Sequence, residues 1–348
     1  SAFYFAGLMY DFANSVNNNK WMSGSLNIQG AAFYVKGNYD KAIIYYKKTL
    51  KLGDKNGIAS SLNNIGLIYN YQGNYQEALI YYKKSLKIRK KIGDKHGAAI
   101  SLNNIGIIYK NQNKLDDAII YYKKSLEISE ELGDKRECAA ALSNIGIVYS
   151  DQDKYTEALL YLKKSLIVFK ELADKKGIAS SLNDIGNIYS HQSNYDKALI
   201  YYNNSLKVFE ELGDNSGISM SLGDIGDAYK HKNKFQKAII NFEEGFQIAK
   251  NIGALDQVNR HSKSLYELYK KGNNLNKALK MHELYMESKD SLAKMDAEQE
   301  LYKFEFEKEY ELEKQADSLK FSEQMNIKSE QIKTQNEKIE KERVIKYS

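Results

Sequence analysis

The chain has 348 residues, a net charge of +6 and a hydrophobic fraction of 43%, which together are typical of a soluble protein with a sizeable core. The charge is too mild to indicate the clustered basic face that nucleic-acid binding needs. No apolar run is long enough to cross a bilayer. Proline is absent, which favours helices joined by short turns. The single cysteine, Cys138, excludes an internal disulfide framework.

The first predicted element is an apolar helix at the start of the chain. In the frame of the repeats that follow it, residues 1–20 correspond to the second helix of a repeat whose first helix is absent. Terminal repeats normally carry a polar cap, so an open apolar end is unusual. The chain also starts with Ser1 rather than methionine. Both features predict that this sequence was cut from a longer protein.

Internal repetition dominates the next part of the chain. The segment from Leu62 to Tyr69, with the sequence LNNIGLIY, returns in similar form from Leu102, Leu142, Leu182 and Leu222. Its glycine therefore recurs every 40 residues, at Gly66, Gly106, Gly146, Gly186 and Gly226, and an earlier copy has Gly30. A period in this range predicts a solenoid. We assign six repeats to residues 21–252 and a degenerate seventh to residues 253–290.

Each repeat has the pattern of two helices. Leu62, Ile65 and Tyr69 form one apolar stripe at helical spacing, and a second stripe begins at Tyr75 after the break at Gly73-Asn74. A Gly-Asp pair then ends the second helix and starts the next, because glycine suits the C-terminal cap and aspartate the N-cap. The sequence therefore predicts an all-α fold made of helix pairs.

Small and large residues alternate where the paired helices must touch. Gly66 and Ala78 allow close approach, and the rings of Tyr69 and Tyr82 fill the space around them. This alternation resembles the tetratricopeptide repeat, in the 40-residue form of kinesin light chains and of polarity adaptors of the Leu-Gly-Asn type. The resemblance implies a right-handed superhelical solenoid whose first helices line a concave, ligand-binding groove.

The last predicted element is a long charged helix at residues 291–348. It lacks glycine, and its thin apolar seam follows coiled-coil spacing at Leu312, Ala316 and Leu319 and, after a slip, at Met325, Ile332 and Ile339. This segment could pair with a second copy to form a homodimer, or it could be a single solvated helix. Polar residues near the seam, such as Asn336, make a stable isolated dimer doubtful.

The tail carries a second resemblance. The segment YKFEFEK from Tyr302 to Lys308, followed by helix rich in Lys, Glu and Gln, is similar to the stalk of bacterial membrane signalling proteins of the histidine kinase or cyclase type. In those proteins a tetratricopeptide sensor leads through a charged helix to a membrane span and an output domain. This resemblance implies a periplasmic sensor whose only membrane contact is an absent downstream segment. The alternative is a soluble cytoplasmic scaffold that assembles protein complexes.

No pattern of catalytic or cofactor-binding residues is present. The histidines form no metal-binding motif, there is no phosphate-binding glycine loop, and paired carboxylates such as Asp116-Asp117 do not converge on a site. The lysine pairs, for example Lys83-Lys84, lie on second helices, which face the convex outside in this architecture. We therefore expect no enzymatic activity, no cofactor, no metal and no nucleic-acid partner.

The groove-lining residues of the first helices are the predicted binding site for a protein or extended peptide. Asparagine offers both a donor and an acceptor, which matches the amides of an extended backbone, and in the resembling adaptors asparagines at this place clamp the ligand. The alternative is that these amides bond neighbouring helices. The predicted site residues are Asn63, Asn64, Leu67, Asn103, Asn104, Ile107, Asn144, Ile147, Asn183, Asp184, Asn187, Asp224 and Asp227.

The predicted groove becomes acidic in its later half. Asp184, Asp224 and Asp227 appear only there, which predicts a ligand with a basic segment towards the C-terminal repeats. The chaperone-binding subfamily instead holds a terminal carboxylate with basic groove residues. The stripe where such a residue would be needed reads Ser60, Ile100, Ala140, Ser180 and Met220, so we expect no carboxylate clamp.

Overall fold

The computed structural model describes the backbone of residues 2–347, together with the side chains of residues 3–297 and of some residues between 300 and 336. All regular secondary structure in this range is helical. The chain divides into two compact units, residues 1–292 and 293–348. The helices are α1 (Ala2–Ser15), α2 (Asn19–Val35), α3 (Tyr39–Thr49), α4 (Lys55–Tyr71), α5 (Tyr75–Ile92), α6 (Lys95–Asn111), α7 (Leu115–Leu132), α8 (Lys135–Asp151), α9 (Tyr155–Glu171), α10 (Lys175–His191), α11 (Tyr195–Leu212), α12 (Asn215–His231), α13 (Phe235–Ile252), α14 (Leu255–Lys271) and α15 (Leu275–Tyr347).

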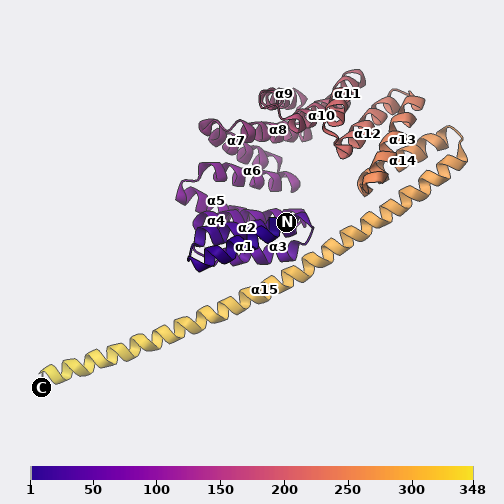
Figure 1. Ribbon diagram of the computed structural model, residues 1–348. Coiled ribbons are helices and arrows are strands. Elements are labelled where there is room, and N and C mark those ends of the chain that lie inside the picture. The colour runs from indigo at the N-terminus through magenta and orange to yellow at the C-terminus, as the bar shows by residue number, and fades with distance from the viewer. Residues whose placement is uncertain (1, 348) are drawn as a thin grey trace. The chain divides into compact units, whose positions relative to one another are not determined.

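Residues 1–292 form a solenoid of packed helix pairs, which confirms the predicted all-α repeat fold (Figure 1). The even-numbered helices α2 to α12 are each the first of a pair, and the following odd-numbered helix is the second. Neighbouring first helices approach one another closely along the array from α2 to α14, whereas the backbones of consecutive second helices from α3 to α13, all within the described residues, stay further apart. The first helices therefore lie on the inner side of the curve and the second helices on the outer side.

Local capping groups start and end many of the helices. Asp94, for example, accepts a hydrogen bond from the backbone N–H of Gly97 at 2.9 Å, which satisfies one of the free donors at the start of α6. The preceding Gly93 has a φ of 74°, the left-handed conformation that ends α5. Ala173 takes the same left-handed role with a φ of 51°, where the other repeats have glycine.

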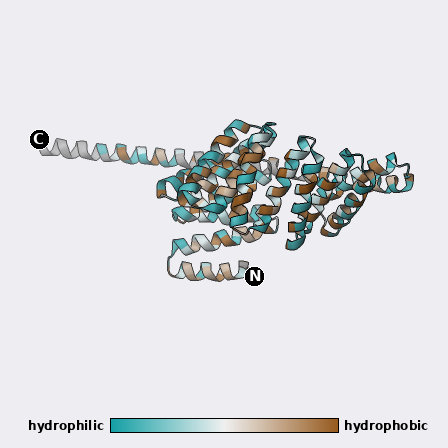
Figure 2. Cartoon of the chain, turned by 90° about the horizontal axis from the view of Figure 1, so that it is seen from above, coloured by the Kyte–Doolittle hydropathy of each residue, from teal (hydrophilic) through white to brown (hydrophobic). Residues whose placement is uncertain are grey.

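The core of most repeats is an aromatic ring seated on a glycine. A Cβ atom on Gly106 would lie 2.6 Å from the ring of Tyr122, so only glycine lets α6 approach α7 this closely. Phe242 contacts Gly226 in the same way, and Leu162 takes the place of the ring at Gly146. The predicted close approach at the recurrent glycine is thus present, and apolar and polar residues alternate along the helices around it (Figure 2).

A serine on the second helix ties together the two helices of the second to fifth repeats. The hydroxyl of Ser125 donates to the backbone oxygen of Ala99 at 2.8 Å, and the pairs Ser85–Ala59, Ser165–Ala139 and Ser205–Ala179 repeat this bond at the same distance. In the sixth repeat the two roles are exchanged, because Ser219 on the first helix donates to the backbone oxygen of Gly245 on the second. The space beside Gly245 is filled by the ring of His261 from α14.

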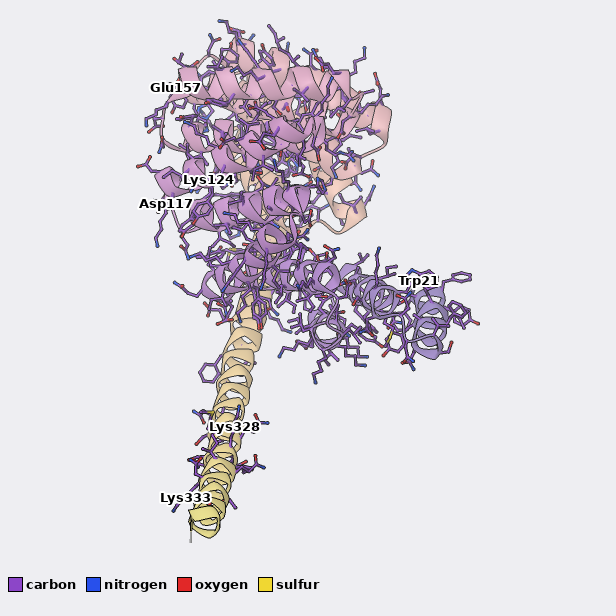
Figure 3. All side chains as sticks on the ribbon, turned by 90° about the vertical axis from the view of Figure 1, so that its left-hand side faces the viewer. Trp21, Asp117, Lys124, Glu157, Lys328 and Lys333 are labelled. Atoms are coloured by element: carbon purple, nitrogen blue, oxygen red, sulfur yellow. The ribbon has the colours of Figure 1, made fainter. Side chains whose placement is uncertain are left out.

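The outer surface carries the lysine pairs. Lys124 of α7, Asp117 of α7 and Glu157 of α9 are exposed and point outwards (Figure 3). Salt bridges also link the two helices of one repeat, as between Lys135 of α8 and Glu171 of α9 at 2.7 Å, with both side chains more than half exposed. Within the described residues, none of the helices combines the length and apolarity that crossing a bilayer requires.

Helix α15 begins as the second helix of the seventh pair and continues without a break to Tyr347. The predicted boundary near residue 290 therefore falls inside one helix, close to the end of the first compact unit at Leu292. Of the predicted seam, Leu319, Met325 and Ile332 are more than half exposed. The side chains of Leu312, Ala316 and Ile339 lie outside the described residues. Pairing through this helix stays a prediction.

Candidate functional site

The predicted site residues all lie on first helices, and so on the inner side of the array. They come from α4, α6, α8, α10 and α12. Asn183 is buried, and the others are half-buried. This placement makes one strip of mostly polar side chains along five successive first helices, and it leaves the part of the strip that faces the groove reachable from solvent.

Asparagine amides bond neighbouring first helices along the early half of this strip. The side-chain nitrogen of Asn104 donates to the side-chain oxygen of Asn63 at 3.1 Å, and Asn144 donates to Asn103 at 2.9 Å. Asn64 shares a hydrogen bond with the hydroxyl of Tyr46. The structure thus brings these amides together as the interhelix alternative predicts. The clamping of a ligand backbone by the same amides stays a prediction.

The apolar part of the strip also contributes to the core. Ile107 packs against the buried cluster of Ile145 and Tyr122, and Ile147 packs against the cluster of Leu162. Leu67 is half-buried at the equivalent place on α4. These side chains present only part of their surface to the groove.

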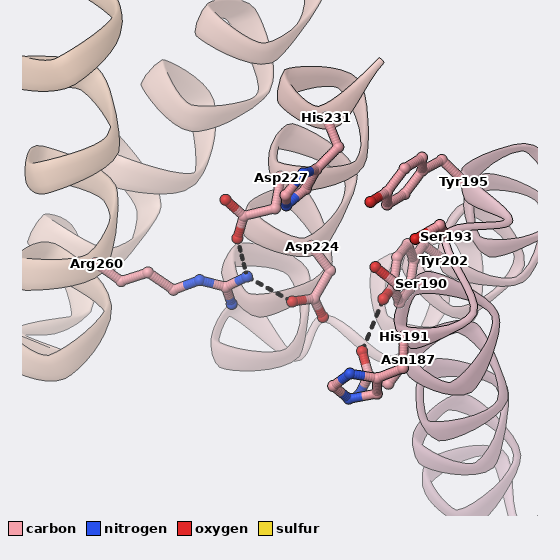
Figure 4. A pocket seen from close by; sticks show the side chains of 10 residues that line it. All are labelled: Asn187, Ser190, His191, Ser193, Tyr195, Tyr202, Asp224, Asp227, His231 and Arg260. Carbon is pink, nitrogen blue, oxygen red and sulfur yellow. Dashed lines mark hydrogen bonds and ion pairs between the residues drawn. The ribbon is translucent and has the colours of Figure 1, made fainter. Parts of the chain in front are cut away.

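A polar pocket of about 550 Å³ lies at the acidic end of the strip, between α10, α11, α12 and α14 (Figure 4). The hydroxyl of Tyr202 donates to the side-chain oxygen of Asn187 at 2.8 Å. Arg260 reaches from α14 to both aspartates of α12, at 2.6 Å from Asp224 and 2.6 Å from Asp227. The pocket is lined by Asn187, Ser190, His191, Ser193, Tyr195, Tyr202, Asp224, Asp227, His231 and Arg260.

The Arg260 ion pairs change the charge of this end. Burial raises the pKa of the Asp224 carboxyl, and Arg260 opposes that rise. Conversely, the two aspartates raise the pKa of the Arg260 guanidinium despite its burial. Asp224 and Asp227 are therefore already partnered within the chain, so the acidic end is less negative than the sequence implies.

Arg260 was missed by the sequence analysis, although a signal for it exists. It stands 40 residues after Met220, in the stripe where the sequence analysis found no basic residue. The seventh repeat lacks the recurrent glycine, having Tyr266 at that place, so the stripe was not extended into it. The groove therefore contains a basic residue, Arg260, and two carboxylates hold it.

Replacing Arg260 by methionine is expected to lower the free energy of unfolding by about 1–2 kcal/mol. The change leaves two carboxylates without a cation, but the cost is moderated because Asp227 and Arg260 are partly exposed. Urea denaturation followed by circular dichroism measures it. The matched control is Arg136→Met, since Arg136 pairs with Asp174 at 3.2 Å with 76% of its side chain exposed. Equal effects in the two variants would contradict the role assigned to Arg260.

This arrangement defines a helical-repeat solenoid whose inner face carries polar side chains. The sequence profile described as tetratricopeptide repeat matches residues 22–91, 57–131, 97–171 and 177–251, which is more than half of the chain. The chain therefore belongs to the tetratricopeptide repeat family.

Solved structures share this fold at low sequence identity. BtubC (BKLC) from P. vanneervenii is 19% identical with a TM-score of 0.54, over 66% of this chain and 92% of its own. A Rap protein complexed with competence and sporulation factor is 19% identical with a TM-score of 0.59, over 79% and 76%. The Rap conjugation gene regulator of plasmid pLS20, in complex with the Phr* peptide, is 17% identical with a TM-score of 0.57, over 80% and 76%. No curated protein matches the chain at a significant level.

Proposed function

We propose that the array is a protein- or peptide-binding module that holds an extended segment of its partner along the inner strip of first helices. The observation that carries this proposal is the continuous row of half-buried amide and carboxylate side chains on α4 to α12, with a pocket at its end. Such side chains can pair with the amides of an extended backbone. The two Rap proteins that share the fold are described as complexes, one with competence and sporulation factor and one with a Phr* peptide.

The binding test uses the full chain as bait for partner proteins and for a random peptide library. Segments that bind are measured against the double variant Asn104→Ala with Asn144→Ala. Removing amides that a ligand uses is expected to weaken binding by about tenfold or more. The control is Asn204→Ala, an exposed asparagine on the outer helix α11. Binding that responds to the control and not to the inner variants would reject the groove.

We further propose that the array has no catalytic activity and serves as the sensor or interaction domain of a bacterial signalling protein, on the periplasmic side of a membrane. The continuity of α15 from the seventh pair to Tyr347 supports this proposal. A ligand that alters the packing of the seventh helix pair would also alter the position of the first turns of α15, which belong to that pair. The rival proposal is a cytoplasmic scaffold.

The full-length gene separates these two proposals. A membrane span followed by an output domain after residue 348 is expected for the sensor, whereas a stop codon there would reject it.

Sedimentation equilibrium of the full chain tests whether residues 291–348 form a homodimer, and a monomer at all accessible concentrations would reject pairing through this helix.

A further inference from the structure

From α4 to α12, polar bonds between successive first helices form a regular series with one gap among the described residues. Each bond joins a residue to the one 41 positions later. The bond between α8 and α10 is missing, because the Ser143 hydroxyl pairs instead with the Ser165 hydroxyl of α9 at 2.8 Å. Its expected partner on α10 would be Asp184. The bonds that are present are Asn63–Asn104, Asn103–Asn144 and Asn183–Asp224.

Asp184 is left without a hydrogen bond or ion pair among the described residues. Burial raises the pKa of its carboxyl to about 6, the charge of Asp224 on α12 adds to the rise, and Lys110 on α6 opposes it. Beside it, Asn183 is 5% exposed and its side-chain oxygen also has no hydrogen-bond partner. An ionised carboxylate in such surroundings is unfavourable until a cation or a donor reaches it.

The other carboxylates of the strip differ from Asp184 in this respect. Asp224 accepts from Asn183 and Arg260, and Asp227 accepts from Arg260. Only Asp184 keeps a negative charge that no group of the chain pairs with in the described part of the strip. Asp184 lies on α10, between α8 and α12, and so within the strip along which the proposed ligand extends.

We propose that Asp184 receives a positively charged group of the bound segment, either a lysine or arginine side chain or an amino terminus. The inference rests on the proposed peptide-binding function and deepens it, because it assigns the basic part of the ligand to one residue. Charge-assisted hydrogen bonds are about twice as strong as neutral ones. A ligand cation bound to Asp184 would lie between α8 and α10 at the place where, among the described residues, Ser143 and Asp184 form no bond to each other.

The test uses three short probes and the full chain. The probes are acetyl-Ala-Lys-Ala-amide, the same peptide with norleucine in place of lysine, and Ala-Ala-Ala-amide with a free amino terminus. Nuclear magnetic resonance titration measures their dissociation constants. We expect one of the two cationic probes to bind about tenfold tighter than the norleucine probe, and which of them does so distinguishes a side chain from an amino terminus.

The tighter binding of a cationic probe than of the norleucine probe should disappear in Asp184→Asn. It should persist in the matched control Asp117→Asn, because Asp117 is exposed on α7. Earlier repeats have asparagine at the place of Asp184, namely Asn104 and Asn144. The Asp184→Asn variant is therefore expected to fold. With Lys110 and Asp224 as the charged groups that face it, Asp184 ionises through about pH 6. The preference should therefore grow as the pH rises from about 5 to about 7.

Equal binding of all three probes, absence of binding by any of them, or a preference that survives in Asp184→Asn would overturn the assignment. These results leave the proposed function separately testable, because longer segments captured by the full chain could still depend on Asn104 and Asn144. Captured segments that ignore those amides would reject the groove itself.

Discussion

Replacement of Tyr122 by alanine is expected to lower the free energy of unfolding by about 3–5 kcal/mol. The ring is fully buried between α6 and α7 and lies directly on Gly106. Because glycine has no side chain that could move into the space, the cavity left by alanine cannot collapse. Urea denaturation of the full chain, followed by circular dichroism, measures the change.

Two further substitutions at Tyr122 test this explanation. The Tyr122 hydroxyl is buried without a hydrogen-bond partner among the described residues, so Tyr122→Phe is expected to be neutral or slightly stabilising. Tyr122→Leu should lie between phenylalanine and alanine, since Leu162 fills the same place against Gly146. A loss in Tyr122→Phe as large as that in Tyr122→Ala would show that the hydroxyl, rather than the packing of the ring on glycine, stabilises the repeat.

The stability of the array is expected to fall by about 3 kcal/mol as the pH drops from about 6.5 to about 4, because of His261. Its ring is 1% exposed and its Nε2 lies 3.0 Å from the Ser219 hydroxyl. Burial, with a smaller contribution from the neighbouring Arg260, lowers the pKa of this histidine to about 4. The unfolded chain therefore takes up a proton before the folded chain does, and acid favours unfolding. Above about pH 7.5 the histidine is neutral in both states and contributes no pH dependence.

The effect of His261 is isolated by comparing the wild-type chain with the His261→Gln variant. The free energy of unfolding of both proteins is measured across the pH range. Asp184 titrates in an overlapping range with the opposite sign, because its raised pKa gives stability that is lost as the pH rises through about 6. That contribution is present in both proteins and cancels in their difference. The stability of the wild-type chain should fall towards that of the variant on acidification. Parallel profiles would contradict the assignment to His261.

The repeat period predicts most of the fold because each unit repeats the same local signals. Gly66 and its equivalents predict the close helix contact, and the Gly-Asp pairs predict the helix ends, since both depend on residues near in sequence. The bonding of the asparagines was less predictable. The partner of Asn63 is Asn104 on the next first helix, so the choice between a bond to the ligand and a bond to the neighbouring helix depends on how successive repeats are rotated.

Arg260 and the gap at Asp184 were not predicted for a related reason. Both depend on a departure from the repeat: an arginine in the degenerate seventh unit, and a serine, Ser143, where the units directly before and after it have an asparagine. The sequence shows each departure, but its effect on charge depends on side chains from three different helices. Three aspartates in the sequence therefore indicate a strongly acidic groove, whereas the structure leaves one of them unpaired.

The exchange of roles between Ser219 and Gly245 also limits how the array can change in length. The repeats with Ser85, Ser125, Ser165 and Ser205 share one kind of internal contact, so a gene duplication or deletion of one such unit would join surfaces of the same kind. No other unit could take the place of the one that ends in the contact between Gly245 and His261. The remaining second helices carry a side chain where this one has Gly245, and that side chain would clash with the His261 ring of α14. Gain and loss of units should therefore be confined to the earlier repeats, with the last junction inherited as a fixed end.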